Sequence, residues 1–378
     1  MSKEAFIAGY VRTPFTAARK GAFAGLRPDD LGAHAIRALL ARTGVPGEAI
    51  EDVIWGCAFP EGEQGLNIGR VCGLRAGLPV TVGGVTVNRW CGSSMQAVQM
   101  AAGMLATNAG EAFVAGGVES MSRVPMMGFN MSPPPAWSAE EATNYTNMGI
   151  TAENVASAFG ISRREQEEFA VRSQGRALAA QAAGRLDAEI APVEVDGVTV
   201  DRDGCPRETT LESLAGLRTV FMENGTVTAG TSSPMTDGAT AVLVCSGDFA
   251  SRHGLAPLAR VASYAVSGCA PAVMGLGPIE SSRKALARAG LTMADIDIIE
   301  MNEAFASQSE ACRRELGIDA DRLNIDGGAL AIGHPLGATG ARLVGKAATL
   351  LRREGGKRAL ATQCIGGGMG IAMVLEAV

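Results

Sequence analysis

The sequence has little of what many protein classes depend on. Lysine and arginine number 33 against 39 acidic residues and form no basic block, which argues against nucleic acid as a partner. No apolar run approaches the roughly 18 residues of a membrane-spanning helix. The polar first residues, followed at once by a strand-like run, are not typical of a signal peptide. We therefore expect a cytoplasmic protein that binds neither nucleic acid nor membrane.

Closely spaced cysteines are absent from the sequence, and histidines are few. The eight cysteines are scattered and no CxxC pair occurs, so we expect neither a metal site nor a disulfide framework. Only three histidines are present. His34 lies in an amphipathic pattern and His253 in a turn, and we expect both to be structural or exposed. His334 is the remaining candidate for chemistry.

The chain of 378 residues, 47% of them hydrophobic, contains an internal repeat. Residues 30–59 and 276–305 align without a gap at an offset of 246, for example Arg37 with Arg283. Each copy predicts an amphipathic helix stopped by glycine, a short turn and a buried strand. A second pairing follows in the same order, with a predicted strand, turn and helix after each copy. Alternating strands and helices of this kind predict an α/β protein with helices covering mixed or parallel sheets.

A different segment separates the two copies. We expect an N-terminal core half of residues 1–120 plus about 236–257, a loop domain of 121–235, and a C-terminal core half of 258–378. The middle segment has a proline-rich loop at 131–137 and nine arginines but no lysine. Thr151 is a candidate cap for one helix ending at Gly160. Ser162 and Glu165 form a capping box for a second helix that continues to Gly175 or beyond. Most of the arginines are expected on a solvated face, with one or two left to meet an anionic ligand.

Cys91 lies between a β-branched run, Val82–Val87, and a predicted helix that includes Ala97, Ala101 and Leu105. Ser93 and Ser94 are good helix N-caps, which places the cysteine near the first free N–H groups of the helix. That position favours a thiolate, the nucleophilic form of cysteine. The alternative, a small buried apolar residue, is the more common role for a cysteine taken alone.

Four further residues in the second half suggest chemistry. His334 lies in a glycine-rich loop, where backbone can approach a ligand closely. Cys364 ends a predicted strand directly before a run of three glycines, at the rim where α/β sheets bind ligands. Asn302 and Glu303 end the strand of the second repeat, where the first repeat has Gly56 and Cys57. Tertiary hydrogen bonds or a positioned ligand would each explain that polar pair.

Together these residue types fit nucleophilic catalysis by a cysteine thiolate. A free cysteine has a pKa of about 8.5, so a nearby histidine is needed to take its proton. A second cysteine can serve as acid and base. N–H groups of a glycine turn and a water held by asparagine can stabilise an oxyanion, an effect on the order of a hundredfold in rate.

At this point the sequence resembles a known family. Its motifs are similar, in order and spacing over essentially the full length, to those of thiolases, which are acyl-CoA acetyltransferases. The resemblance implies a duplicated, layered αβαβα core with an inserted loop domain that holds much of the coenzyme A. The motifs that carry it are VNRWCGSSMQA (87–97), AGGVESMSR (115–123), TAGTSSPMTDGA (228–239), MNEAF (301–305), NIDGGALAIGHPLGATGAR (324–342) and CIGGGMG (364–370).

The resemblance assigns a role to each catalytic candidate. Cys91 would be the acylated nucleophile, and His334 would deprotonate it. His334 would then share an oxyanion hole with a water held by Asn302. Cys364 would be the acid and base. The N–H groups of Cys91 and Gly366 would form a second oxyanion hole.

It also implies how the substrate is held. Ser233 would contact the pantetheine and Phe305 would lie near the acyl-CoA tail. Met148 and Arg207 of the loop domain are candidate contacts for coenzyme A, Arg207 for its nucleotide. The implied reaction is the reversible thiolytic cleavage of 3-ketoacyl-CoA to acetyl-CoA and a shortened acyl-CoA. Coenzyme A would be a substrate, with no metal or redox cofactor, and the protein a homodimer or homotetramer.

One position separates two branches of the family. The short-chain biosynthetic branch usually has histidine before the Met-Gly pair of the loop domain, whereas Asn147 precedes it here. This difference favours the degradative branch. A biosynthetic acetoacetyl-CoA thiolase and a non-catalytic acyl-CoA- or lipid-binding protein remain alternatives. Ketosynthases use Cys-His-His and 3-hydroxy-3-methylglutaryl synthases Cys-His-Glu, and a cysteine at 364 fits neither.

Overall fold

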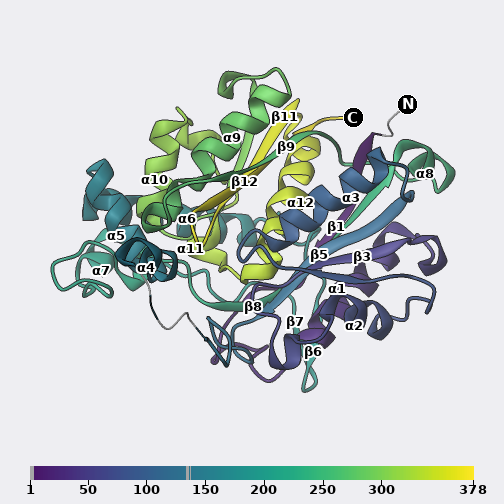
Figure 1. Cartoon of the computed structure of the whole chain (residues 1–378), viewed down its shortest axis with the longest axis horizontal. Coiled ribbons are helices and arrows are strands. Elements are labelled where there is room, and N and C mark those ends of the chain that lie inside the picture. The colour runs from purple at the N-terminus through teal and green to yellow at the C-terminus, as the bar shows by residue number, and fades with distance from the viewer. Residues whose placement is uncertain (1–3, 133–135, 137) are drawn as a thin grey trace.

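A computed structural model describes residues 4–132, 136 and 138–378. Nine strands form a continuous sheet in the order β10-β11-β12-β9-β1-β8-β5-β3-β4, and β2 pairs with β8 (Figure 1). The strands are β1 (Ala5–Arg12), β2 (Thr16–Ala17), β3 (Asp52–Gly56), β4 (Val85–Val87), β5 (Ala112–Ser120), β8 (Thr236–Ser246), β9 (Ala259–Gly268), β10 (Ile298–Met301), β11 (Arg358–Ile365) and β12 (Met369–Glu376).

The sheet has two halves of the same topology, which confirms the internal repeat. In the first half β3 runs parallel to β5, and β8 and then β1 follow antiparallel. In the second half β10 runs parallel to β11, and β12 and then β9 follow antiparallel. Strands β3 and β10 begin 246 residues apart, at Asp52 and Ile298. The halves join through the pairing of β1 with β9, at Phe6 with Arg260 and Ile7 with Ala259.

Helices lie on the outer face of each half of the sheet and also between the two halves. The molecule therefore has the five-layered αβαβα arrangement (Figure 1). One apolar cluster joins α1 and α2 to the outer face of the first half, and another joins α9 and α10 to the outer face of the second. A third cluster between the halves surrounds α3 and α12. These helices are α1 (Pro28–Thr43), α2 (Ile68–Arg75), α3 (Ser93–Ala106), α9 (Gly277–Arg288), α10 (Ala306–Glu315) and α12 (Leu336–Glu354).

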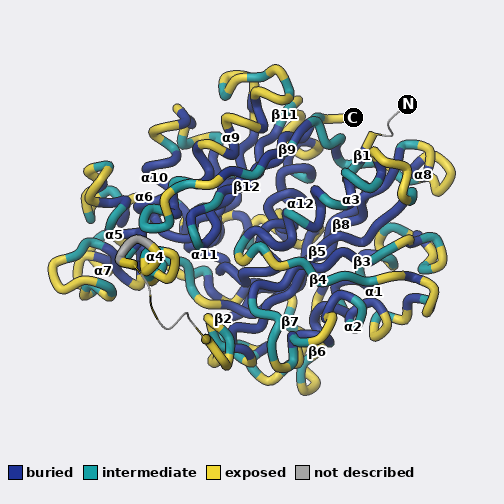
Figure 2. The backbone as a smooth tube through the Cα atoms, in the orientation of Figure 1, coloured by how far each residue is buried: buried dark blue, intermediate teal, exposed yellow. Residues whose placement is uncertain are grey.

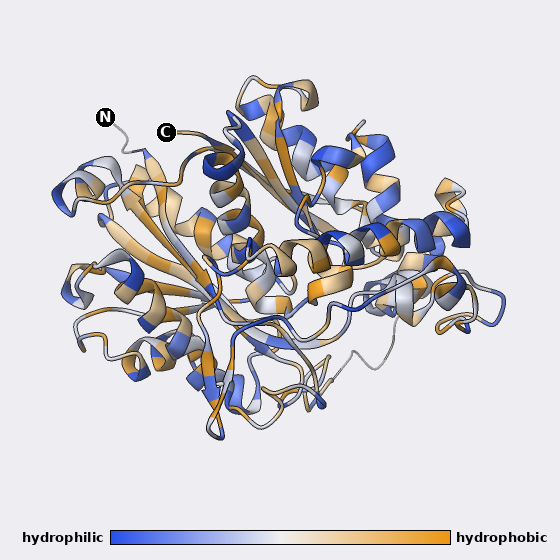
Figure 3. Cartoon of the chain, turned by 180° about the vertical axis from the view of Figure 1, so that it is seen from behind, coloured by the Kyte–Doolittle hydropathy of each residue, from blue (hydrophilic) through white to orange (hydrophobic). Residues whose placement is uncertain are grey.

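The middle layer contains a deeply buried helix. Helix α12 is buried along almost its whole length (Figure 2), and the strands on either side are strongly apolar (Figure 3). At its start α12 approaches α3 so closely that a Cβ on Gly340 would lie 2.4 Å from the backbone nitrogen of Met95. The Ser94 hydroxyl accepts a hydrogen bond from the Ala341 N–H at 2.9 Å. These contacts fix the two helix starts, one from each half, against each other.

The segment between the halves forms a helical layer beside the second half. Its capping-box prediction is confirmed, since Ser162 and Glu165 cap α6 reciprocally. The Thr151 prediction is wrong: Asn147 caps α5, its side chain accepting from the Gly149 N–H, so that helix starts one turn earlier. Four positions of the proline-rich loop, 133–135 and 137, lie outside the described residues. The elements are α4 (Ala139–Ala142), α5 (Met148–Phe159), α6 (Arg163–Ala182), β6 (Val193–Val195), β7 (Val198–Val200) and α7 (Leu211–Ala215), followed after β8 by α8 (Gly247–Arg252).

Candidate active site

Cys91 lies in a tight turn between β4 and α3, as the sequence predicts, but the local details differ. Strand β4 starts at Val85 rather than Val82, and the N-cap of α3 is Gly92, so Ser93 and Ser94 are the first helical residues and not caps. The Ser93 hydroxyl instead closes the turn, accepting from the Arg89 N–H at 2.9 Å and donating to the Trp90 carbonyl. Trp90 takes a left-handed conformation, with φ of 42°.

The thiol of Cys91 is held by the second half of the protein. Burial raises its pKa to about 11, opposed by hydrogen bonds from the N–H of Gly366 and from its own N–H. The side-chain amide of Gln363 donates to the Cys91 carbonyl. Both contacts come from the end of β11, so this strand positions the cysteine although it lies more than 270 residues further along the chain.

Cys364 lies at the end of β11, between these two contacts, and is buried. Burial raises its pKa well above the usual range, and the neighbouring Cys91 raises it further. Its apolar surroundings include Phe305 and Met148. Cys364 is therefore a neutral thiol in the resting protein, close enough to Cys91 for that residue to raise its pKa.

His334 is buried and its ring is oriented by Thr339. Its Nδ1 lies 2.6 Å from the Thr339 hydroxyl oxygen, and that hydroxyl is 2.9 Å from the Pro335 carbonyl. Because the hydroxyl has one hydrogen, which it donates to the carbonyl, it accepts the proton carried by Nδ1. Nε2 is then the bare nitrogen, 3.3 Å from the Asn302 side-chain amide. Burial lowers the pKa of His334 to about 3, so the imidazole is neutral.

Asn302 and Glu303, which the sequence left open, have separate roles. Asn302 follows β10, and its Oδ1 is buried with no hydrogen-bond partner among the described residues. Glu303 is satisfied by the protein: its carboxylate accepts from Ser173 at 2.6 Å, from Asn324 at 2.7 Å and from the Leu330 N–H at 3.1 Å. Glu303 is structural, whereas Asn302 keeps a free acceptor beside the imidazole.

Three of the four candidate coenzyme contacts lie together. Ser233 donates its N–H to the Ala304 carbonyl at 3.0 Å, and Phe305 shares an apolar cluster with Met148 and Cys364. Arg207 is exposed elsewhere on the loop segment, where its N–H donates to the Gln174 side chain at 3.0 Å. No described contact joins Arg207 to the other three.

The structure adds neighbours that the sequence analysis missed. Phe221 packs edge-on against Phe305, with ring centroids 6.1 Å apart, and lies so near α5 that a Cβ on Gly149 would be 2.2 Å from its ring. Phe221 precedes the TAGTSSPMTDGA motif by seven residues and is one of only 11 phenylalanines, which was the available signal. Thr339 and Gln363 carried no such signal.

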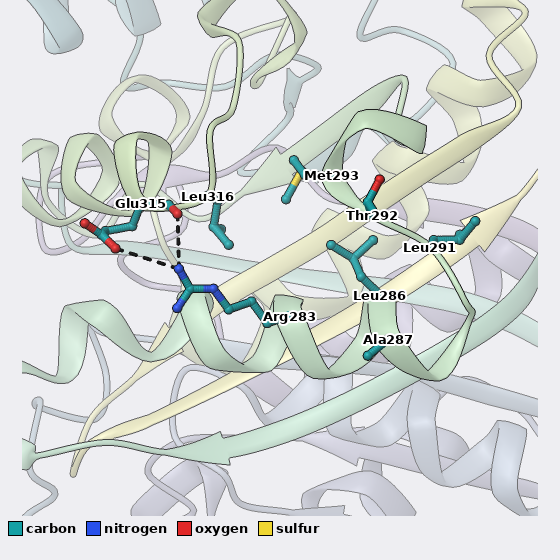
Figure 4. A pocket seen from close by; sticks show the side chains of 8 residues that line it. All are labelled: Arg283, Leu286, Ala287, Leu291, Thr292, Met293, Glu315 and Leu316. Atoms are coloured by element: carbon teal, nitrogen blue, oxygen red, sulfur yellow. Dashed lines mark hydrogen bonds and ion pairs between the residues drawn. The ribbon is translucent and has the colours of Figure 1, made fainter.

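One surface pocket of the described residues lies apart from the cysteine site. A pocket between α9 and α10 is lined by Leu286, Met293, Leu316 and an Arg283–Glu315 pair, and shares no residue with the cysteine site (Figure 4). Within residues 4–132, 136 and 138–378, no three histidine, cysteine or acidic side chains are grouped to hold a metal ion. Over the same residues no helix is long and apolar enough to cross a membrane.

A partly buried cysteine under an N–H donor, with a second cysteine close enough to affect ionisation, is typical of acyltransferases that carry the acyl group as a thioester. The comparisons agree. The chain matches the thiolase N-terminal domain over residues 5–248 and the thiolase C-terminal domain over residues 255–377. It belongs to the thiolase family and is an acyltransferase.

Full-length relatives have the same description. The chain is 46% identical to a 3-ketoacyl-CoA thiolase of Bacillus subtilis (strain 168), with 99% of each chain covered. It is 48% identical to a 3-ketoacyl-CoA thiolase of Shewanella denitrificans (strain OS217), and 46% identical to one of Aeromonas salmonicida (strain A449), with 100% of each chain covered.

Proposed function

We propose that this protein cleaves 3-ketoacyl-CoA with a second molecule of coenzyme A, giving acetyl-CoA and an acyl-CoA shortened by two carbons. The observation that carries the proposal is the Cys91 thiol under the Gly366 N–H and near Cys364, together with the contact between Asn302, which follows β10, and the neutral His334 on the loop that leads into α12. Coenzyme A is a substrate here, and the reaction uses no metal or redox cofactor.

The first half-reaction acylates Cys91. Its thiol gives a proton to Nε2 of His334 as the sulfur attacks the 3-keto carbon. The raised pKa of the thiol and the lowered pKa of the imidazole make a free ion pair costly, so proton transfer accompanies attack rather than preceding it. The C2–C3 bond then breaks, and the Cys364 thiol protonates C2 of the departing acetyl-CoA.

The second half-reaction restores the enzyme. Cys364, now a thiolate, takes the proton of the incoming coenzyme A thiol, whose sulfur attacks the acyl group on Cys91. The N–H groups of Cys91 and Gly366 stabilise the oxyanion formed in each half-reaction. His334 and a water on Asn302 Oδ1 stabilise the enolate oxygen of acetyl-CoA in the first half-reaction, when the C2–C3 bond breaks. His334 returns its proton to the Cys91 sulfur as the new acyl-CoA leaves.

The coenzyme is held between the loop segment and the second half. Ser233, Phe305 and Met148 are proposed to contact the pantetheine and acyl portions. Arg207 is retained as a candidate for the nucleotide because an exposed guanidinium on the same segment can pair with phosphate.

Covalent capture tests the proposal. Incubation with an acyl-CoA is expected to add one acyl group to Cys91, detected by mass spectrometry of the intact protein and its peptides. The Cys364→Ala variant keeps the nucleophile and should still be acylated, but should lose condensation and thiolysis by about a thousandfold or more. Coenzyme A binding without any adduct on Cys91 would instead favour a non-catalytic acyl-CoA-binding protein.

A biosynthetic acetoacetyl-CoA thiolase is the second candidate, and a chain-length series separates the two. Activity confined to the four-carbon substrate would exclude the degradative function. We also infer a homodimer or homotetramer in the cytoplasm; the eight free thiols fit a reducing compartment, and sedimentation of the purified protein reports its size.

A further inference from the structure

Trp90 is a large apolar side chain in an unusual position. It directly precedes Cys91 in the chain, the residue is 38% exposed, and its φ of 42° is a conformation that costs a non-glycine residue energy. The turn holds it firmly: its N–H donates to the Asn88 side chain at 2.8 Å, and its carbonyl accepts from the Ser93 N–H at 3.0 Å. The direction of the indole is therefore set by the same turn that presents the nucleophile.

The indole lies against the backbone of the glycine turn. A Cβ on Gly367 would be 2.4 Å from the ring, and a Cβ on Gly366 would be 3.3 Å from the ring and 3.6 Å from the sulfur of Met148. The ring and the Met148 thioether thus flank Gly366, whose N–H bonds the Cys91 sulfur. Sulfur and aromatic groups of this kind make adaptable apolar contacts.

The residues proposed to act around Cys91 form one polar group and one apolar group. His334, Asn302 and Cys364 supply the polar groups that act on the reacting carbons. Trp90 and Met148 supply apolar surface around Gly366, the residue whose N–H bonds the Cys91 sulfur, and the surface of Trp90 is partly open to solvent. An acyl chain attached to Cys91 would cover this surface, removing both the chain and the ring from water.

We propose that the exposed face of Trp90 is the platform for the acyl chain, and that it selects 3-ketoacyl-CoA substrates with straight chains of about eight carbons or more over the four-carbon substrate. The inference rests on the proposed function, since it requires an acyl group on Cys91. Covering about 50 Å² of apolar surface at about 25 cal/mol per Å² corresponds to roughly a tenfold preference in kcat/KM.

The test compares Trp90→Ala with Trp90→Phe across substrates of four, eight and twelve carbons. The ratio of kcat/KM for eight carbons over four should fall about tenfold in Trp90→Ala and by less than threefold in Trp90→Phe, which keeps an aromatic face. Val198→Ala, an exposed apolar change on the β7 hairpin, is the matched control and should leave the ratio unchanged.

Two outcomes would overturn the inference. An equal loss for all chain lengths would mean that Trp90 only positions Cys91, and a rise for long chains in Trp90→Ala would mean that the ring is a barrier. If Trp90→Ala does not fold, as judged by circular dichroism, the same ratio measured for Trp90→Phe against Trp90→Leu decides. Acylation of Cys91 is measured in every variant, so that failure of the proposed function, with no adduct in the parent protein, is distinguished from failure of this inference.

Discussion

Thr339 determines which nitrogen of His334 is available for chemistry. Its hydroxyl is occupied by the Pro335 carbonyl, and so it accepts the Nδ1 proton and leaves Nε2 bare toward Asn302. A base in a buried site needs this tautomer fixed, because rotation or tautomerisation would present an N–H to the thiol. Thr339 is a positioning residue for the proposed base.

Replacing Thr339 tests this role. Thr339→Val keeps the shape of the side chain but removes the acceptor, and should lower kcat about tenfold to a hundredfold with KM changed by less than threefold. Thr339→Ser keeps the hydroxyl and should restore most of the rate. Steady-state thiolysis of a single 3-ketoacyl-CoA measures both variants. Equal losses in Val and Ser, or a loss mainly in KM, would contradict the assignment.

At the level of single residues, the sequence was informative where the residue type was unusual for its place. Cys91, His334, Cys364 and Asn302 were found because reactive or polar groups followed strands or sat among glycines. Gln363, Thr339 and Trp90 were not, because their contribution depends on what lies opposite them after folding. Gln363 acts on a carbonyl more than 270 residues away, and ordinary amide and hydroxyl side chains carry no mark of such a contact.

Individual elements were predicted well where periodicity and caps act locally, and less well where packing decides. The capping box of α6 is read from four adjacent residues. By contrast, α12 begins at Leu336, inside the glycine-rich stretch around His334 that the sequence predicts to be a loop, because Gly337 and Gly340 belong to the helix. These two glycines allow α12 to approach α3 and the end of β5, where a Cβ on Gly337 would lie 2.7 Å from the Val118 carbonyl.

Helix α6 provides a prediction about pH. Hydrogen bonds from the Ser162 hydroxyl and N–H, and from Arg314, lower the pKa of Glu165 to about 2, against 4.5 for the free side chain. Because the folded pKa is the lower one, the stabilisation is present above pH 4.5 and is lost as the pH falls from 4.5 to 2. Glu165→Gln should cost about 0.5–1 kcal/mol at pH 7, since solvent screens a carboxylate that is 34% exposed.

Urea unfolding at several pH values measures the effect. The difference in unfolding free energy between parent and Glu165→Gln should shrink toward zero as the pH approaches 2, provided both remain folded enough to fit. Glu168→Gln on the same helix is the control: Glu168 pairs with Arg164 in an exposed i, i+4 arrangement and should show less than half the effect. A Glu165 difference that is constant with pH would contradict the cap assignment.

Across the whole molecule, Arg12 joins the segment between the halves to the core. This fully buried guanidinium on β1 contacts Glu189 at 2.8 Å and Asp203 at 2.6 and 2.8 Å. Lys346 of α12 reaches the same Glu189 at 3.0 Å. A buried ion-pair network of this kind is stable only when every charge has its partner, because a buried charge left unpaired lowers the free energy of unfolding by several kcal/mol.

Arg12→Met should therefore lower the free energy of unfolding by about 3–5 kcal/mol, since it leaves Asp203 buried without its cation. Arg164→Met, which breaks an exposed pair, is the matched control and should cost about 0.5 kcal/mol or less. Urea unfolding monitored by circular dichroism gives both values. A loss of unfolding free energy below 1 kcal/mol for Arg12→Met would show that this network contributes little to holding the segment between the halves against the core.

The overall architecture is the most predictable feature of the molecule, because the internal repeat encodes the same arrangement of strands and helices in both halves. Offsets of 246 residues place β3 on β10 and so fix the two-half topology before any contact is known. What the sequence could not state is how the halves face each other. That depends on α3 and α12 meeting at glycines and serines, whose small size becomes meaningful only when the opposite helix is present.

The pairing of β1 with β8 has a consequence for protein synthesis. Strand β1 has its main partner at 236–246, and at about 5–20 residues per second that partner is synthesised roughly 11 to 50 s after β1. Helix α3, with Cys91 at its start, packs against α12, which is translated later still. During that interval the nascent chain exposes apolar strands with open edges, which makes it a natural client for chaperones that bind growing chains.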